Sequence, residues 1–312
     1  MPDQELCGIL IVNKPSGLTS HDVVLRVRRM AGQRKVGHAG TLDPLARGVL
    51  LVCLGQATRV SEYLVLGAKV YRALIRLGTT TDTYDADGEV TSQAPVAVSR
   101  AQIEDRLQGF VGDHRQIPPA YSALKRGGIP LYKLARRGEA GRREAEDIAA
   151  RDARTIHIGS VKLLQWTPPD LEIEVRCGKG TYIRSLAHEL GQQLGCGAHL
   201  AGLTRVASGS FRIEQSVSLE ELEQAFARGQ GPGVLLPMDA ALAEFPAAAL
   251  DPVAVSKVRT GQRIQLANPP PADVCRAYTL DGRLAALLQL DVDGWWRPHK
   301  VFLGQMVDDS HP

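Results

Sequence analysis

The residues best suited to chemistry lie in one short stretch, Gly37 to Leu50, which reads GHAGTLDPLARGVL. Its glycines allow another backbone to approach closely, and Pro44 stiffens the chain directly after the carboxylate of Asp43. The pattern predicts a shaped loop over Val36 to Pro44 that presents this carboxylate. The spacing also fits an ordinary Asp-Pro turn with His38 as a loop histidine, so the stretch by itself leaves both interpretations open.

Strands and helices on either side must position this loop. Gly8 to Val12 is apolar and β-branched and predicts a strand, and Gly48 to Leu54 predicts a second, buried strand. Between them we expect a helix capped by Ser20 and ended by Gly32. Other expected elements are a helix over Ala57–Leu66, a strand over Val70–Leu77, helix starts at Ser99 and Ser218, a hairpin over Lys162–Cys177 and a helix over Tyr182–Leu194. This irregular order favours an α+β fold with a mixed, largely antiparallel sheet.

A change in composition near Pro246 predicts two domains. Residues 1–247 would form the larger domain, and residues 248–312 carry short β-like runs separated by turn signals such as Asp281-Gly282. We therefore expect a small β-rich domain at the C-terminal end.

A basic segment lies at about residues 115–150. From Arg115 to Ala145 there are eight Lys and Arg but only two Glu, a larger surplus than the +3 of the whole chain. Tyr121 and Tyr132 are interleaved with this charge, and glycines make the segment bendable. A flexible basic arm with aromatic side chains suits RNA, whose phosphates attract the charge and whose bases stack on rings. An ordinary solvated helix face would have the same composition.

The overall composition excludes several classes of protein. The 312 residues are 44% hydrophobic and 23% charged, as in ordinary globular proteins, and no apolar run could span a membrane. Asp3 and Glu5 are unlike the start of a signal peptide, and five scattered cysteines without a C-x-x-C pair fit a reducing compartment. We expect a cytoplasmic protein with no membrane contact. Asp85 and Asp87 alternate as metal ligands do, but no partner completes a calcium-loop spacing, so turn chemistry is preferred and no metal site is expected.

Several ordered motifs together resemble one family. The loop matches the pattern G-H-x-G-x-L-D-P-x-A-x-G of the TruB-type bacterial tRNA pseudouridine synthases at every fixed position. Matching segments elsewhere are NKPSGLTS from Asn13, GQATR from Gly55, TDTYDADG from Thr81, IPPAYSALK from Ile117 and KGTYIRSL from Lys179. The resemblance runs from about Gly8 to Val217. It implies a pseudouridine synthase fold for the catalytic domain and, more weakly, a PUA-like RNA-binding domain at the C-terminus.

The resemblance also implies an activity. A uridine in the T loop of tRNA, at position 55 of the tRNA numbering, would be isomerised to pseudouridine without cofactor, metal or guide RNA, by a protein that acts as a monomer. Asp43 would be the essential catalytic carboxylate, attacking the substrate or taking a ribose proton. Because burial disfavours a charged carboxylate, a cation must lie beside it, and the family's arginine is Arg184 here.

The remaining site residues are also implied by the resemblance. Tyr71 would stack on the flipped uracil, Tyr182 would close the pocket near the base, and Leu203 would form an apolar wall. His38 would contact the RNA backbone or hold the opened T loop, and Lys14 would support the loop or contact RNA. Without the motifs, each of these residues would be interpreted as an ordinary structural one.

Two other functions remain open from the sequence. One is a tRNA-binding folding helper, in which opening the elbow of tRNA matters and the chemistry is incidental. The other is the related guide-RNA-dependent synthase of archaea and eukaryotes, which shares the aspartate loop.

Overall fold

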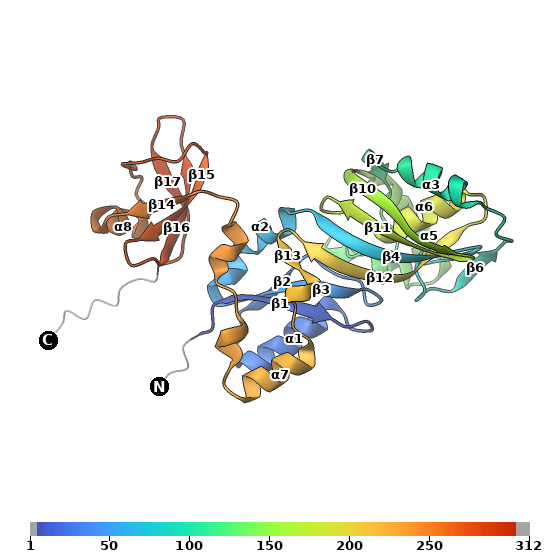
Figure 1. Cartoon of the computed structure of the whole chain (residues 1–312), viewed down its shortest axis with the longest axis horizontal. Coiled ribbons are helices and arrows are strands. Elements are labelled where there is room, and N and C mark those ends of the chain that lie inside the picture. The colour runs from blue at the N-terminus through green and yellow to red at the C-terminus, as the bar shows by residue number, and fades with distance from the viewer. Residues whose placement is uncertain (1–4, 304–312) are drawn as a thin grey trace.

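The computed structural model describes residues 5–303 and arranges them as a large sheet domain and a smaller C-terminal module (Figure 1). Asp3 and the end of the expected C-terminal domain, residues 304–312, lie outside the described residues. None of the helices in this part of the chain is both long and apolar enough to cross a membrane.

Nine strands form the large sheet. Seven follow the order β1-β3-β12-β4-β11-β10-β7, while β2 pairs with β3 and β13 with β12. Only β12 and β3 run parallel, so the predicted mixed, largely antiparallel sheet is confirmed. The strands are β1 Gly8–Lys14, β2 Val36–Ala39, β3 Arg47–Leu54, β4 Lys69–Leu77, β7 Gly112–Gln116, β10 Arg154–Thr167, β11 Asp170–Cys177, β12 Ala198–Ser208 and β13 Phe211–Arg212.

Buried and exposed side chains alternate along β4, which shows which face of the sheet is covered. Its odd-numbered residues are buried, among them Tyr71 and Ile75, while Arg72 and Arg76 point to solvent. Helices cover the buried face, where apolar residues of α3 and α6 join one core with the strands. Two more helices, α1 and α7, pack near β1 (Figure 1). These helices are α1 Ser20–Ala31, α3 Arg100–Gln108, α6 Ile183–Gln193 and α7 Leu219–Ala227.

Short elements complete the large domain. They are the 3-10 helices η1 Gly55–Val60, η2 Ile213–Gln215, η3 Gly231–Val234 and η4 Met238–Leu242, the helix α2 Ser61–Leu66, and the paired strands β5 Thr79–Thr81 and β6 Val90–Gln93.

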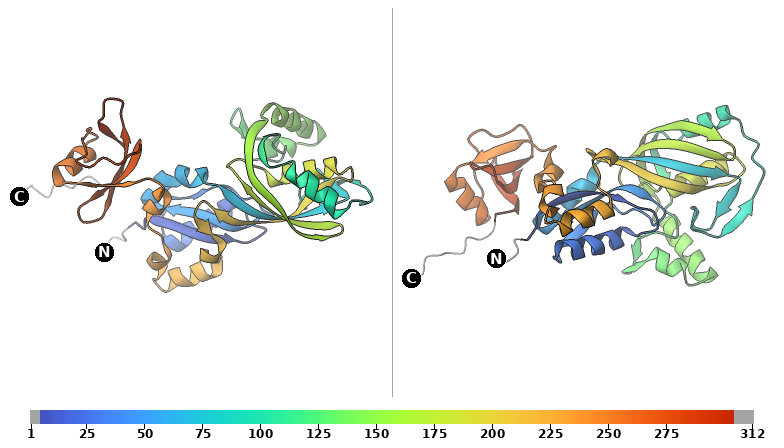
Figure 2. Two further views of the ribbon diagram at one scale, coloured as in Figure 1. Left: turned by 45° about the horizontal axis from the view of Figure 1, so that its top comes forward. Right: turned by 60° about the horizontal axis from the view of Figure 1, so that its bottom comes forward.

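The basic segment is folded into local structure. Strands β8 (Lys125–Arg126) and β9 (Ile129–Pro130) form a tight hairpin, whose two turn glycines both have positive φ, as a two-residue turn requires. Helices α4 (Leu131–Ala135) and α5 (Glu139–Arg151) follow. Both views in Figure 2 show these helices, in green, projecting from the large sheet. We call residues 117–151 the arm.

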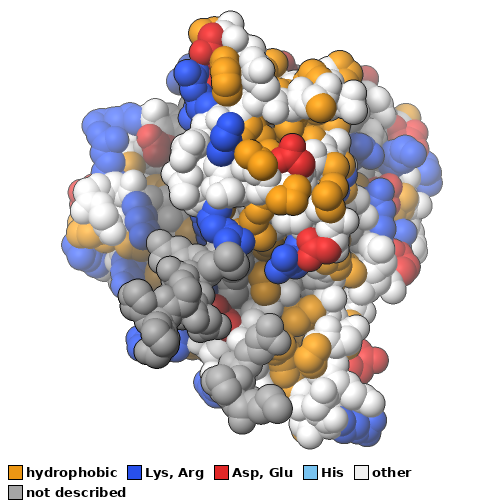
Figure 3. Space-filling model, turned by 90° about the vertical axis from the view of Figure 1, so that its left-hand side faces the viewer, with side chains coloured by type: hydrophobic (Ala, Val, Ile, Leu, Met, Phe, Trp, Pro, Cys, Tyr) orange, Lys and Arg blue, Asp and Glu red, His pale blue; other side chains and the backbone are white. Residues whose placement is uncertain are grey.

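The C-terminal module has its own sheet, in the order β14-β15-β16-β17. Its core surrounds the buried Trp296, yet Leu287 and Phe302 join a second core with β1 and β3 of the large domain. Seen from the module's end, side chains of both charges are interspersed with apolar ones (Figure 3). The elements are β14 Ala247–Leu250, α8 Pro252–Arg259, β15 Val274–Thr279, β16 Leu284–Leu290 and β17 Trp296–Val301.

Two local predictions were wrong, and a third element is helical as expected but differs in helix type. The cap of α1 is Thr19, whose hydroxyl accepts the Asp22 N–H in a full capping box, so Ser20 is already helical. Val36–Ala39 is the strand β2 and not loop, because it completes the sheet against β3. The helix expected over Ala57–Leu66 begins as 3-10 helix and becomes α-helical only at Ser61.

Candidate active site

The loop that carries Asp43 connects β2 to β3, near the β1 end of the sheet. Gly40 and Gly48 stand at its ends with φ of +84° and +99°, values that side chains disfavour. A Cβ on Gly48 would also lie 2.3 Å from the carbonyl oxygen of Arg205. These glycines therefore let the loop leave the sheet and return to it beside β12.

Lys14 is hydrogen-bonded to the loop that carries Asp43. Its ammonium group is fully buried and donates to the carbonyl oxygens of Pro15 at 2.9 Å, Pro44 at 3.3 Å and Ala46 at 2.6 Å. Burial lowers the pKa of Lys14 to about 8, although the nearby charge of Asp43 opposes this shift. Lys14 thus contacts the backbone of the loop that carries Asp43.

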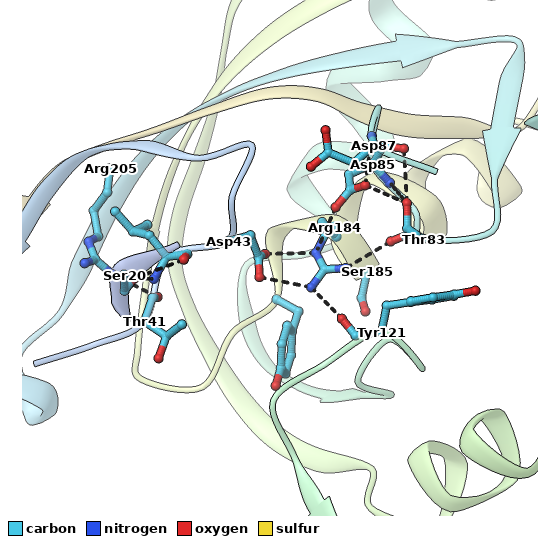
Figure 4. A network of polar contacts seen from close by, with 12 residues as sticks. Ser20, Thr41, Asp43, Thr83, Asp85, Asp87, Tyr121, Arg184, Ser185 and Arg205 are labelled. Carbon is cyan, nitrogen blue, oxygen red and sulfur yellow. Dashed lines mark hydrogen bonds and ion pairs between the residues drawn. The ribbon is translucent and has the colours of Figure 1, made fainter. Parts of the chain in front are cut away.

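Arg184 reaches Asp43 from the first turn of α6, 141 positions along the chain. Its Nε donates to Asp43 Oδ2 at 2.9 Å and a terminal nitrogen donates to Oδ1 at 3.2 Å, which makes the contact bidentate (Figure 4). The arginine side chain is 5% exposed and the aspartate side chain 34% exposed. The structure therefore gives the carboxylate a fixed cationic partner and an open side.

Two backbone carbonyl oxygens accept two further hydrogen bonds from Arg184. One belongs to Thr83, at 3.1 Å, and the other to Tyr121 at the root of the arm, at 3.0 Å. The guanidinium therefore joins the catalytic loop, the loop after β5 and the arm at one point.

Asp85 is a site residue that the sequence interpretation missed. It is 5% exposed and one of its carboxylate oxygens lies 3.5 Å from Arg184 Nε. Thr83 Oγ1 and the backbone N–H of Asp87 donate to the other oxygen. These are the hydrogen bonds of a turn, as expected, but they do not account for the contact between Asp85 and Arg184. Burial raises the pKa of Asp85, and Arg184 opposes that shift. Asp85 lies in the TDTYDADG segment that matches the family, which was the one sign that it could belong to the site. The spacing of this segment does not indicate a contact with Arg184.

A cavity of about 270 Å³ opens on Asp43 and Arg184. Its lining includes Tyr71, Tyr182 and Leu203, so the structure brings these three predicted residues to the same place. A cavity of this kind, with aromatic and apolar walls, suits one unstacked base rather than a duplex.

The two tyrosines are held differently. Tyr71 is 8% exposed and lies in the middle of β4. Tyr182 precedes α6, and the side-chain amide of Gln116 bonds its backbone N–H at 2.7 Å and its carbonyl at 3.0 Å. The guanidinium of Arg154 lies over the Tyr182 ring, 5.3 Å from its centre. Tyr71 thus lines the cavity from the middle of a strand, whereas Tyr182 lines it from the N-terminal end of α6.

His38 does not line the cavity. It lies on β2, where burial lowers the pKa of its ring, and its Nδ1 has no hydrogen-bond partner within residues 5–303. The lowered pKa favours the neutral ring at pH 7, and no hydrogen bond joins His38 to Asp43 among residues 5–303.

The described residues contain no group of three or more metal-ligating side chains. The site offers instead one reactive carboxylate, a buried guanidinium and a cavity for a planar ring. Such a site can act on the sugar of a base that has been turned out of a nucleic acid.

Comparisons with known proteins identify the class. The description "TruB family pseudouridylate synthase (N terminal domain)" matches residues 28–183, and "tRNA pseudouridylate synthase B C-terminal domain" matches residues 184–243. The protein is a pseudouridine synthase with the fold of that class. More narrowly, the chain belongs to the TruB family.

Individual relatives agree over nearly the full length. The tRNA pseudouridine synthase B of Dehalococcoides mccartyi is 43% identical over 96% of this chain and 97% of its own. That of Stutzerimonas stutzeri is 40% identical over 96% of both chains. Among solved structures, a chain of an H/ACA RNP bound to a substrate RNA containing 2'-deoxyuridine is 26% identical, with a TM-score of 0.71 over 96% of this chain and 86% of that one. A chain of the archaeal box H/ACA sRNP Nop10-Cbf5 complex gives 26% identity and a TM-score of 0.70, covering 96% of this chain and 87% of that one.

Proposed function

We propose that this enzyme converts the uridine at position 55, in the T loop of tRNA, to pseudouridine, alone and without metal or organic cofactor. The observation that carries the proposal is the bidentate pair of Asp43 and Arg184 at the mouth of the cavity. The relatives named tRNA pseudouridine synthase B, at 40% to 43% identity over nearly the whole chain, support tRNA as the substrate.

The reaction needs only one reactive carboxylate. The bond from C1′ to N1 breaks, the uracil turns within the cavity, and C5 bonds to C1′ while its hydrogen is lost. Asp43 either attacks C1′ or takes a ribose proton. A glycoside hydrolase needs a second carboxyl group to protonate the leaving group or activate water, whereas here the leaving base is retained and water is excluded.

The other residues bind and orient the nucleotide. Tyr71 would stack on the uracil that has lost its neighbours, Tyr182 would cover it, and Leu203 would keep that wall apolar. Lys14 would keep the loop in place. His38 would contact the RNA backbone outside the cavity, as a neutral donor or acceptor.

The arm and the C-terminal module would hold the rest of the tRNA. The arm carries the local positive charge, and we propose the module as a PUA-like RNA-binding domain bounded near residue 248. The five cysteines are all free, which supports a cytoplasmic location, and we propose a monomer as the working form.

The decisive experiment uses the Asp43→Asn variant and a T-arm transcript labelled with tritium at uridine C5. Wild-type protein should release the label, because C5 loses its hydrogen when it bonds to C1′. The variant should release none while its RNA affinity stays within about threefold, because the amide keeps the shape of the side chain but cannot act as nucleophile or base. A transcript with cytidine at the target position serves as control. Turnover by Asp43→Asn would remove Asp43 from the mechanism. Loss of RNA binding by this variant would make Asp43 a binding residue, and the folding-helper function would then still account for the result.

The same assay tests guide dependence. The structural neighbours include chains of H/ACA ribonucleoproteins, which makes a guided enzyme the second candidate. Label release from the bare T-arm transcript, with no other RNA or protein present, would exclude it.

A further inference from the structure

Arg205 is a buried cation that the mechanism above does not use. It is 1% exposed, and no carboxylate forms an ion pair with it among the residues that the structure describes. Its hydrogen-bond partners are the backbone carbonyl oxygens of Val49 at 2.7 Å, Gly40 at 2.9 Å and Thr41 at 3.4 Å. The guanidinium also acts on Tyr71, whose pKa it lowers against the larger effect of burial. A guanidinium has five N–H donors, so the three bonds to carbonyl oxygens leave two donors on the side of Tyr71 and the cavity. A buried and unneutralised charge is costly and calls for a functional reason.

The position of Arg205 gives that reason. It lines the cavity and stands directly opposite Tyr71 in the pairing of β12 with β4, as Leu203 stands opposite Ala73. A base stacked on Tyr71 would therefore lie beside this guanidinium. In Figure 4, Asp43 is drawn between Arg205 on one side and Arg184 on the other.

The side chains that line the cavity carry more positive than negative charge: the acid is Asp43, and the bases are Lys69, Lys179, Arg184 and Arg205. The two nearby acids, Asp43 and Asp85, already share Arg184. Lys69, at the cavity wall, is buried, and its burial lowers its pKa to about 8, so it can lose its proton. Arg205 cannot, because the pKa of a guanidinium is too high. It supplies a permanent positive charge at a place where no protein group neutralises it.

The reaction creates an anion at this place. If Asp43 attacks C1′, the electron pair of the C1′–N1 bond stays on the uracil. C5 then attacks C1′, the carboxylate leaves, and the C5 proton is finally lost as N1 gains one. If Asp43 instead takes the C2′ proton, the uracil leaves as the same anion, and C2′ regains the proton after C5 has bonded. On either route a negative charge spread over N1 and O2 forms inside the cavity.

We propose that Arg205 is a further catalytic residue, whose free N–H groups stabilise the negative charge on the detached uracil. This rests on the proposed function of pseudouridine formation. A preorganised cation is most effective in a dry site, because no solvent must reorganise as the charge develops. The three hydrogen bonds to backbone carbonyl oxygens fix the guanidinium of Arg205 in place before the substrate binds.

The test compares two target nucleotides in the same T-arm RNA, uridine and 5-fluorouridine. Fluorine withdraws electrons and stabilises the departing anion, so this substrate depends less on the protein for that stabilisation. The rate measured is the single-turnover consumption of the target nucleoside at saturating RNA. We expect Arg205→Gln to slow the uridine reaction by about 100-fold and the 5-fluorouridine reaction by less than about 10-fold. Arg205→Lys keeps the charge and should lie between wild type and Arg205→Gln on uridine.

Each other outcome has a defined meaning. An equal loss on both substrates would reduce Arg205 to a support of the loop. A weaker RNA affinity with an unchanged saturating rate would make it a phosphate contact, and either result overturns the proposal. If Arg205→Gln does not fold, the two-substrate comparison is made with Arg205→Lys, where an equal loss on both substrates has the same meaning. Failure of wild-type protein to act on uridine would refute the proposed function instead.

Discussion

At the scale of residues, two carboxylates share one guanidinium. Asp43 is bonded to Arg184 through both oxygens, while Asp85 lies 3.5 Å from the Nε of Arg184 and is itself held by Thr83. Asp43 faces the cavity and Asp85 is buried. Asp85 therefore holds the guanidinium of Arg184 on the side away from the cavity. Any effect of Asp85 on the reaction must act through the position of Arg184.

Asp85→Asn tests this positioning role. The variant keeps the shape of the side chain but loses its charge, so Arg184 is held less firmly and the carboxylate of Asp43 shifts. We expect the single-turnover rate to fall by roughly 10- to 100-fold, since small misplacements of reacting groups cost about that much. RNA affinity should stay unchanged because Asp85 is buried. Asp87→Asn is the matched control, since the Asp87 side chain is exposed and should tolerate the change. A rate for Asp85→Asn equal to that of the control would contradict the role.

The residues of the site differ in how far the sequence predicts them. The types and spacing in the Gly37–Leu50 stretch single out Asp43 as presented but not as reactive, and the family motifs are needed to choose Arg184, which comes from another element. Asp85 could not be chosen, because an Asp-x-Asp pair in a turn and a carboxylate aimed at an arginine read alike. The direction of a side chain depends on packing that local spacing does not encode.

At the scale of elements, α6 connects the cavity to the arm. Its start is held by Gln116, its first residues include Arg184, and Ser185 Oγ donates to the carbonyl of Ile117 at 2.8 Å. One turn further along, Glu189 is partly buried and forms no ion pair with any residue in the described range 5–303, and burial raises its pKa to about 7. The helix thus contains a carboxyl group whose charged form is disfavoured by burial and which the proposed reaction does not use.

Glu189→Gln should stabilise the protein in a pH-dependent way. The folded pKa of about 7 lies above the ordinary value of 4.5, so between these pH values the folded state binds more protons and stability falls as pH rises. Removing the titration should raise the unfolding free energy at pH 8 by up to about 3 kcal/mol. Near pH 4.5 and below, where the group is largely neutral in both states, the gain should vanish. Urea unfolding of both proteins at pH 4.5 and pH 8 measures this, and an equal difference at the two pH values would contradict it.

Elements were more predictable where local chemistry decides them. The capping boxes at Ser99 and Ser218 begin α3 and α7 as predicted. The strand β2 was missed, since its residues favour a loop until β3 offers them backbone partners. Thr19 and Ser20 are both good caps by type, and only the reciprocal bond to Asp22 distinguishes them.

At the scale of the whole molecule, shape and charge are distributed unevenly. The arm projects from the sheet and holds eight Lys and Arg against four Asp and Glu, a larger surplus than the +3 of the whole chain. The C-terminal module shares a core with the large domain through Leu287 and Phe302. The sequence predicted a separate β-rich unit but not this shared core, because contacts between distant segments leave no periodic signal. The module is thus fixed to the sheet domain by packing, and the arm is the projecting basic part.

The charge of the arm should dominate the salt dependence of RNA binding. Lys125 and Arg126 are exposed on the hairpin and form no ion pair within the described part of the chain. Each phosphate contact contributes about 0.7 to 0.9 to the slope of log affinity against log salt, because counterions are released. Replacing both residues by Gln should therefore lower the slope for tRNA by about 1.5, and the loss of affinity should be larger at low salt than at high salt. Arg34→Gln with Arg228→Gln removes the same charge from exposed positions outside the arm. Filter binding between 50 and 300 mM salt compares the two, and equal slopes for both double variants would mean that the arm is not the part that meets the RNA backbone.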